Sequence, residues 1–300
     1  MIQSAGSHQQ PPPPPGQRFA EAAGFLACPV CSGGLSPCGA SLECTEGHVF
    51  DVARQGYVSL LTGKGTVHRS DTAAMVASRN AIFDAGLYAP IVAAVAQTCA
   101  SSKVIVDAGG GPGQYLAAAL DVAAEHSGSE SGPIGIGLDL SKYCARSAAK
   151  RHPRAVSVVA DLWAGLPLQD GVVDTVLSVF APRNAAETAR VLRPGGQWVI
   201  VTPRPAHLAE ILAPMRMLAV GEAKAARIGH ELAADFTSPQ TTVVRAEVEF
   251  DETALLNVAA MGPAAFHRTH EELAAAAAAL AAGGSVRARL DVNVTVAQRI

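Results

Sequence analysis

The sequence predicts an α/β protein in which a small zinc-binding module precedes a doubly wound parallel sheet. Four soft metal ligands lie close together near the N-terminus, in the patterns Cys28-x2-Cys31 and Cys44-x3-His48. From Lys103 onward, strand-like and helix-like segments alternate, and a glycine-rich turn joins the first strand of that region to its first helix. Such alternation is typical of a parallel sheet that is covered by helices on both faces.

Length and composition fit one catalytic domain with a small appendage. The chain has 300 residues, of which 49% are hydrophobic and 16% are charged, so it can bury a sizeable core. Its net charge of −3 means that any nucleic-acid site must be a local basic patch. We expect no signal peptide, because the first residues lack a basic start followed by an apolar core. We expect no membrane partner, because the longest apolar run, 273–282, is too short to span a bilayer. A cytoplasmic location is therefore expected, where cysteines serve as metal ligands or free thiols.

Changes in amino-acid composition divide the region ahead of the sheet into three segments. The run Pro11–Pro15 and its polar neighbours oppose regular structure, so the N-terminus is expected to be disordered. A polar linker after the metal ligands leads into a helical pattern from Asp71 to Ala100, which Pro90 breaks into two helices. The boundaries that we expect are 1–24 for the disordered N-terminus, 25–62 for the zinc module, 63–100 for the linker and helices, and 101–300 for the main domain.

The main domain is expected to form a parallel sheet with an antiparallel edge. Short apolar runs predict its strands, and apolar residues at helical spacing predict the helices between them. Ser141 is suited to cap the second of these helices. We expect strands at 104–106, 134–138, 156–159, 172–180 and 198–201, helices at 115–124, 141–152 and 185–192, and an antiparallel pair at 242–250 and 287–296.

The cysteine and histidine spacing predicts a structural zinc site. Zinc takes four soft or borderline donors in a tetrahedron, and each of the two ligand pairs can converge from one tight turn. Four protein ligands leave no open coordination position, so the metal is expected to stabilise the module and not to react. Cys38 lies between the pairs but begins no paired turn, and it is left out of the ligand set. The alternative is a group of free thiols and a surface histidine.

The glycine-rich turn predicts a nucleotide-cofactor loop in a Rossmann-like sheet. Its glycines, Gly109, Gly110, Gly111 and Gly113, allow positive φ angles and a close approach of the backbone to a ligand. Asp107 at the strand end would repel a pyrophosphate but can accept hydrogen bonds from an ammonium group. This favours S-adenosylmethionine, which has an amino-acid end and no phosphate, over a dinucleotide.

Two further carboxylates follow the next strands of the predicted sheet. Asp139 ends the second strand, where it can accept from the ribose hydroxyls of the cofactor. Asp161 follows the third strand, where it can accept from the adenine amino group. For each of them, the alternative is an ordinary helix cap or loop carboxylate.

Eight stretches of the chain match the motifs of one protein family. The chain resembles the bacterial 23S rRNA (guanine-N1)-methyltransferases, including the tylosin-resistance branch, from about residue 25 to its end. The glycine loop and the Leu-Arg-Pro-Gly-Gly turn occur in many methyltransferases, whereas the zinc pattern followed by Gly-Tyr-Val-x-Leu-Leu is specific. The matching stretches are Cys28–Cys31, Cys44–Asp51, Gly56–Leu61, Phe83–Tyr88, Asp107–Gly113, Gly137–Lys142, Ala189–Gly196 and Thr202–Leu208.

The resemblance implies a class I methyltransferase fold, S-adenosylmethionine as cofactor, and methylation of guanine N1 in a 23S rRNA hairpin loop, contributing to macrolide (tylosin-type) resistance. It implies cofactor roles for Tyr88 and His207, zinc at the four ligands of an RNA-recognition module, and a homodimer whose cleft holds the hairpin. The family usually has a cysteine where this chain has Gly110, whose backbone role is expected to persist. The segment 261–268 matches only loosely, so the sequence does not fix which guanine is methylated.

The target nitrogen carries a proton and faces the pairing edge of the base, so the guanine must be unpaired and turned into a pocket. The loop Phe180–Arg183 lies where such enzymes receive the base, but it contains no obvious proton acceptor. We therefore assign no catalytic residue, and the acceptor is either a carboxylate or water. Lys64, His68, Arg69 and Arg79 could contact phosphates, with an ordinary solvated position as the alternative for each.

Two other functions stay open at this stage. One is a small-molecule or protein methyltransferase with a zinc-bearing lid. The other is a non-enzymatic RNA- or antibiotic-binding homologue, in which Gly110 would mark the loss of turnover. Cofactor binding distinguishes the second from any enzyme, and a methyl-transfer assay with different substrates distinguishes the first.

Overall fold

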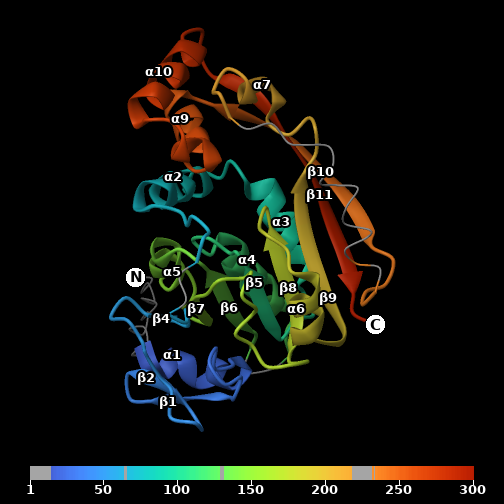
Figure 1. The fold of residues 1–300 in the computed structure, drawn as a ribbon. Coiled ribbons are helices and arrows are strands. Elements are labelled where there is room, and N and C mark those ends of the chain that lie inside the picture. Colours follow the sequence, from blue (N-terminus) through green and yellow to red (C-terminus); the bar gives the residue numbers. More distant parts are fainter. Residues whose placement is uncertain (1–14, 64–65, 129–131, 218–231, 233) are drawn as a thin grey trace, which may run out of the picture.

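A central sheet of eight strands organises the molecule, and a separate sheet of three strands lies below it in Figure 1. The computed structural model describes residues 15–63, 66–128, 132–217, 232 and 234–300. The strand order of the large sheet is β10-β11-β9-β8-β5-β6-β7-β4. The α/β class and the N-terminal module that the sequence predicts are both confirmed.

The N-terminal region is more ordered than expected. Residues 15–25 form helix α1 (Pro15–Ala22) and the 3-10 turn η1 (Ala23–Phe25), which corrects the prediction of disorder for 1–24 in its second half. Phe19 and Ala22 are fully buried, and α1 packs against strands of the large sheet. Residues 1–14 lie outside the described part of the chain.

The small sheet is an antiparallel meander next to the metal ligands: Cys28 and Cys31 precede its first strand, and Cys44 and His48 flank the turn between its second and third strands. It consists of β1 (Leu35–Cys38), β2 (Ser41–Cys44) and β3 (Val49–Asp51). Strand β4 (Tyr57–Ser59) does not belong to it, because it runs parallel to β7 at the edge of the large sheet, with Val58 opposite Val158. Strand β4 therefore joins the end of the module, expected at 25–62, to the edge of the large sheet.

Two helices connect β4 to the rest of the sheet. They are α2 (Ala73–Asp84), capped by the Thr72 hydroxyl, and α3 (Ala89–Thr98), whose first turn holds Pro90. The expected break at this proline is confirmed. In the described part of the chain, no helix by itself has the length and apolar character of a membrane span. Helices α2 and α3 together have that length and composition, but they are bent by 85° at the break between them.

The strands that follow β5 in the chain are added first on one side of it and then on the other, as in a doubly wound sheet. β5 lies between β6 and β8, so the carboxyl ends of three neighbouring strands meet beside the glycine loop. Helix α5 ends at Ala148, earlier than the expected His152, and the Ser141 hydroxyl caps it. The bounds are β5 (Val104–Ala108), α4 (Gln114–His126), β6 (Ile134–Asp139), α5 (Lys142–Ala148), β7 (Ala155–Val159), β8 (Val173–Val179), α6 (Ala185–Val191) and β9 (Leu192–Pro203).

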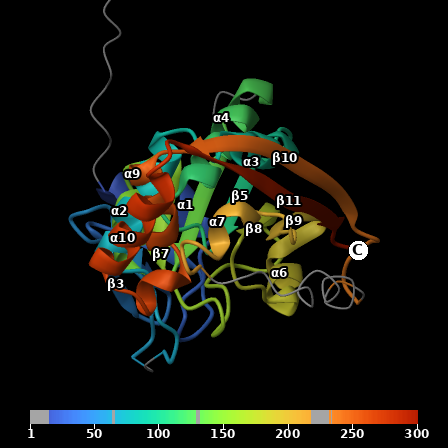
Figure 2. The ribbon, with the colours of Figure 1, turned by 90° about the horizontal axis from the view of Figure 1, so that it is seen from above.

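Two long antiparallel strands complete the other edge, as expected. β10 (Gln240–Phe250) pairs with β11 (Val286–Gln298), which pairs with β9. They rise beyond the rest of the sheet and carry the helices α9 (Glu252–Ala260) and α10 (His270–Ala281), with η2 (Pro263–Phe266) between them (Figures 1 and 2). Because α9 packs against α2, this excursion covers the carboxyl ends of the central strands.

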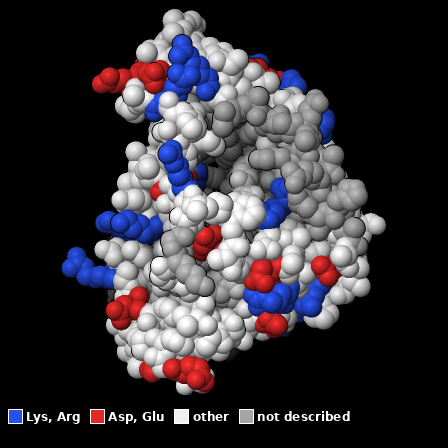
Figure 3. Space-filling model, in the orientation of Figure 1, with Lys and Arg blue, Asp and Glu red and all other residues white. Residues whose placement is uncertain are grey.

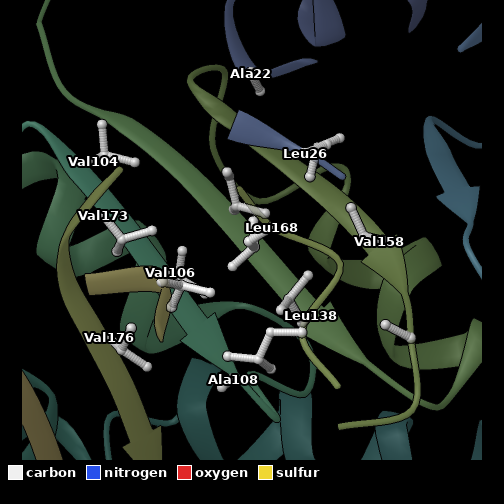
Figure 4. Close-up of a cluster of buried hydrophobic side chains, with 14 of the residues drawn as sticks. Ala22, Leu26, Val104, Val106, Ala108, Leu138, Val158, Leu168, Val173 and Val176 are labelled. Atoms are coloured by element: carbon white, nitrogen blue, oxygen red, sulfur yellow. The ribbon is translucent and has the colours of Figure 1, made fainter. Parts of the chain in front are cut away.

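The two faces of the sheet bury different sets of side chains. Val104, Val106 and Ala108 of β5 point to the face shared with the N-terminal module, where Leu26 and Leu168 also pack (Figure 4). Ile105 points to the opposite face, toward α3 and α4. Since a fully buried Val or Leu contributes about 1.5–3 kcal/mol, the zinc module and the sheet stabilise each other through one core.

Candidate active site and metal centre

Four ligand atoms converge in the small module. The Sγ atoms of Cys28, Cys31 and Cys44 and a ring nitrogen of His48 all lie within 4.8 Å of one another. The Cys31 and Cys44 sulfurs are 3.6 Å apart, while Nδ1 of His48 is 3.7 Å from the Cys28 sulfur and 3.3 Å from that of Cys44. Tetrahedral zinc, with Zn–S of about 2.3 Å and Zn–N of about 2.0 Å, requires S–S edges of about 3.8 Å and S–N edges of about 3.5 Å. The cluster therefore has the dimensions of a structural zinc site.

The fourth free cysteine of the module takes no part in this cluster. Cys38 lies on β1 and is not among the converging ligand atoms, although it is exposed as Cys31 is. The backbone N–H of His48 donates to the Cys44 sulfur at 3.4 Å, a contact that supports a thiolate. The expected ligand set is thus assembled as four residues, without Cys38.

A cavity of about 240 Å³ opens at the carboxyl ends of β5 and β8. Figure 3 shows the molecule hollowed in this region, between the part that carries α9 and α10 and the sheet. This volume exceeds that of one or two water molecules several times. The cavity is lined by Arg79, Phe83, Tyr88, Asp107, Gly109–Pro112, Gln114, Tyr115, Val179, Phe180, His207 and Met261–Pro263.

Asp107 is the buried charge of this cavity. Its side chain is inaccessible to solvent, and neither carboxylate oxygen has a hydrogen-bond partner within the described residues. Burial, followed by the nearby charge of Asp139, raises the pKa of Asp107 to about 7. A buried carboxylate without a donor is costly, so this site favours a ligand that brings a cation or several N–H donors. The ammonium group of S-adenosylmethionine meets that requirement.

The glycines of the loop leave no room for side chains. A Cβ atom at Gly110 would lie 2.7 Å from the Asp107 carboxyl group. Gly109 has a φ of +81°, and a Cβ there would lie 2.7 Å from that of Ala181 in the loop after β8. Gly113 begins α4 with a φ of +88° but does not line the cavity. The loop therefore brings bare backbone to the ligand.

Replacing Gly109 by alanine is expected to weaken cofactor binding about tenfold or more, since it strains the backbone and pushes the Ala181 loop outward. Gly195→Ala is the matched control, because Gly195 has a φ of +75° with nothing within 4 Å of an added Cβ. Both variants should lose about 1 kcal/mol of stability. Isothermal titration with S-adenosylmethionine measures the difference, and equal affinities in the two variants would show that the Gly109 contact is irrelevant.

Asp139 and Asp161 lie beside the cavity and do not line it. Asp139 accepts from the backbone N–H of Gly111 at 2.9 Å and of Ser141 at 2.7 Å, so it also fixes the glycine loop. Asp161 accepts from the backbone N–H of Trp163 at 3.0 Å. Each carboxylate keeps acceptor capacity for a ligand, and their ribose and adenine roles stay proposals.

Tyr88 and His207, which sequence spacing alone did not select, meet in the cavity wall. Their rings are 6.3 Å apart, and the His207 ring stacks on Phe180 at 5.8 Å. The backbone N–H of Asp291 donates to Nδ1 of His207 at 3.2 Å, and burial lowers the pKa of this histidine to about 4. His207 is therefore neutral at physiological pH and carries its proton on Nε2.

Several lining residues have no distinctive pattern in the sequence. Arg79 on α2 pairs with Asp71 at 2.5 Å and donates to the Met261 carbonyl at 2.8 Å, so it joins the segment ahead of α2 to the α9–η2 segment. Phe83 and Pro263 come from the same two regions. Only the packing of α2 against α9 brings them together, and spacing along the chain cannot show it.

The basic residues proposed for phosphate contacts have different surroundings. Arg79 is engaged in the cavity wall, as described above. The His68 ring lies 5.5 Å from that of Trp163, and the Arg69 guanidinium lies 5.9 Å from the Phe266 ring. Lys64 lies outside the described residues. No described contact of these side chains tests their phosphate role.

Comparison with known proteins covers both parts of the molecule. Residues 26–64 match the zinc-ribbon family model described as RlmA, N-terminal, and residues 106–200 match the model of a methyltransferase domain. The 23S rRNA (guanine(748)-N(1))-methyltransferase of Streptomyces fradiae is 43% identical over 256 residues, which is 83% of this chain and 89% of that protein. A Micromonospora griseorubida protein, provisionally named a 23S rRNA (guanine-N(1)-)-methyltransferase, is 39% identical over 277 residues, or 85% and 91% of the two chains. The predicted zinc ribbon and methyltransferase domain are confirmed.

Proposed function

Because the chain belongs to the family of 23S rRNA (guanine-N1)-methyltransferases, we propose that it methylates N1 of a guanine in a 23S rRNA hairpin loop. The single observation that carries this proposal in the structure is the buried Asp107 carboxylate, left without a donor at the base of a glycine-lined cavity. When bound there, S-adenosylmethionine supplies a methyl group on a positively charged sulfur.

The residues around the cavity suit the parts of that cofactor. Asp107 would accept from its ammonium group, Asp139 from the ribose hydroxyls and Asp161 from the adenine amino group. Tyr88 and His207 would close the wall on the side of the methyl group. The lining of the cavity is largely apolar, which strengthens each of these contacts.

The loop after β8 supports a place for the target base. Phe180 is 42% exposed, has a φ of +53° and lies in the cavity wall with its ring on His207. A base that has been turned out of an RNA loop stacks on exposed aromatic rings of this kind. We propose that Phe180 receives the guanine and holds its pairing edge toward the cofactor.

The loss of the N1 proton requires an acceptor, and the described wall of the cavity offers none that is free. His207 already accepts at Nδ1 and is protonated at Nε2, so it acts as a donor. Asp107 is the one carboxylate among the described lining residues, and it is needed for the cofactor. We therefore propose that water takes the proton after the base has been oriented, and we assign no general base.

Three broader features complete the proposal. The zinc module serves RNA recognition, the enzyme acts in the cytoplasm as a homodimer with the hairpin in its cleft, and its product contributes to macrolide resistance. The resemblance to the tylosin-resistance branch and the similarity to the Streptomyces fradiae enzyme support these features. Sedimentation of the purified protein measures the oligomeric state.

The activity is tested with transcripts of 23S rRNA hairpins and tritiated S-adenosylmethionine. We expect methyl incorporation and one reverse-transcription stop, because N1-methylguanine cannot pair. Changing the guanine at the stop to adenine should remove both signals, whereas changing a neighbouring guanine outside the loop should leave them. Transfer to small molecules or proteins with none to rRNA would favour the zinc-lid alternative, and no cofactor binding at all would favour a non-enzymatic homologue.

A further inference from the structure

A line of exposed cations runs along α5 and the turn that follows it. Lys142, Arg146 and Lys150 are all exposed and recur every four residues. The first two lie on one side of α5, and Lys150 lies in the turn that follows. We call these three residues the α5 stripe.

The α5 stripe is not neutralised by acids. Within the described residues none of its members forms an ion pair, whereas Arg79, Arg190 and Arg287 each pair with a carboxylate. The sequence between Asp139 and Asp161 holds no acidic residue but five lysines and arginines: the three stripe residues, together with Arg151 and Arg154, which pair with Asp84 and Glu21. In a chain with a net charge of −3, this is a local positive patch and not a general surface property.

The patch borders a groove that also has an aromatic member. A groove of about 530 Å³ lies between α5 and α2 and is lined by Arg146, Lys150 and Tyr143, among others. Tyr143 is 40% exposed, and the Lys142 ammonium group lies 5.3 Å from its ring. Cations beside an exposed ring are the groups that contact phosphates and unstacked bases of RNA.

The position of α5 links the two functional parts of the protein. At its N-terminal end, the Ser141 hydroxyl donates to the carbonyl of Asp71, whose carboxylate pairs with Arg79 in the cavity wall. At its other end, Ala149 lies against Gly56 near the zinc module, and its carbonyl accepts from Arg18 of α1. Lysine and arginine side chains project from this flank of the molecule at the left of Figure 3, over the region of α5 and α2 in Figure 1.

We propose that the α5 stripe binds the phosphodiester backbone of the RNA that flanks the target nucleotide, between the methyl-transfer cavity and the zinc module. This inference rests on the proposed function and adds a contact surface to it. Phosphate contacts do not read bases, so the stripe would set the position of the hairpin and leave the choice of guanine to the cavity. The three cations would contact about three phosphates.

The test is the triple variant Lys142→Gln, Arg146→Gln, Lys150→Gln in the full-length protein. The control variant, Lys103→Gln, Arg193→Gln, Arg287→Gln, removes the same number of charges from other parts of the surface. Affinity for the 23S rRNA hairpin is measured at several salt concentrations, together with cofactor affinity, melting temperature and sedimentation. We expect the stripe variant to bind RNA about 10- to 100-fold more weakly and its salt slope to fall by about 2 to 3, with cofactor affinity unchanged.

A stripe variant that binds RNA within twofold of the control would overturn the proposal. So would a change from dimer to monomer, which would make the stripe a subunit interface. If the unmodified protein binds the cofactor but neither binds nor methylates any 23S rRNA hairpin, the proposed function itself fails. That result is distinct from a loss confined to the stripe variant.

Discussion

Replacing Cys44 with serine is expected to remove the zinc and to lower rRNA methylation at least 100-fold. Cys44 is buried and lies near both Cys31 and His48, so a hydroxyl in its place removes one of the four ligands of the tetrahedron. A segment with three short strands has little core of its own and depends on the metal for its structure. Zinc content by mass spectrometry and primer extension on the hairpin measure the two effects.

Cys38→Ser provides the matched control, because Cys38 is exposed and outside the cluster. This variant should keep one zinc per chain and normal methylation. Cys28→Ser should behave like Cys44→Ser. Unchanged zinc in both Cys28→Ser and Cys44→Ser would refute the ligand assignment.

Because the zinc module and the large sheet share one core, loss of zinc should also affect the stability of the rest of the protein. Leu26, Leu35 and Leu42 of the N-terminal region belong to the same buried cluster as Val104 and Val106 of β5. Loss of zinc should therefore lower the melting temperature of the whole protein, not only that of the module. The cofactor cavity is walled by side chains of the other face, such as Tyr88 and Tyr115, so cofactor affinity should change little. For the same reason, deleting the N-terminal region would be a poor test, since it would remove β4 and uncover the core.

Features coded by neighbouring residues could be predicted from the sequence. The four zinc ligands lie within 21 residues of chain, so their spacing alone indicates the site. The glycine loop could be predicted for the same reason, because one strand, one turn and one helix bring Asp107 next to Gly109 and Gly111. The order of strands from β5 to β9 also follows from alternation of apolar segments.

Features that depend on contacts between distant parts of the chain could not be predicted from the sequence. β4 is only three residues long and looks like part of the zinc module until it pairs with β7. Arg79 and Met261 are 182 positions apart and meet because α9 returns over α2. The hydrogen bond that Asp139 accepts from the backbone N–H of Gly111 in the glycine loop could not be inferred from its place at a strand end. These contacts decide the shape of the cavity, which is why the sequence identified the cofactor loop but not the wall opposite it.

Replacing Asp107 with asparagine is expected to weaken S-adenosylmethionine binding by about 10- to 100-fold, since charge-assisted hydrogen bonds contribute about 1.5–3 kcal/mol. The carboxylate is buried and has no donor among the described residues, so asparagine replaces it without breaking another contact. The free variant should therefore fold normally. Titration calorimetry measures the affinity, and a change of less than twofold would show that Asp107 does not hold the ammonium group.

The pH dependence gives this assignment a second, independent test. In the free protein the pKa of Asp107 is raised to about 7 by burial and by Asp139, so below pH 7 the carboxyl group holds a proton that it must lose to accept from an ammonium group. Affinity in the unmodified protein should fall by up to about tenfold per pH unit below 7. It should also fall above about pH 8, where an α-amino group loses its proton. His207, with a pKa near 4, does not titrate in this range.

The stability of the cofactor-free protein should decrease as pH rises toward 7, whereas its affinity for the cofactor should increase. A carboxyl group whose folded pKa lies above its unfolded value destabilises the folded state as pH rises from about 4 to 7, because the unfolded chain loses its proton first. Asp107→Asn removes that effect, so the free variant should melt several degrees above the unmodified protein at pH 8 and at the same temperature near pH 4. The variant should also bind the cofactor without the decline below pH 7. If the decline persists in Asp107→Asn, another group controls it, and the buried carboxylate is not the ammonium acceptor.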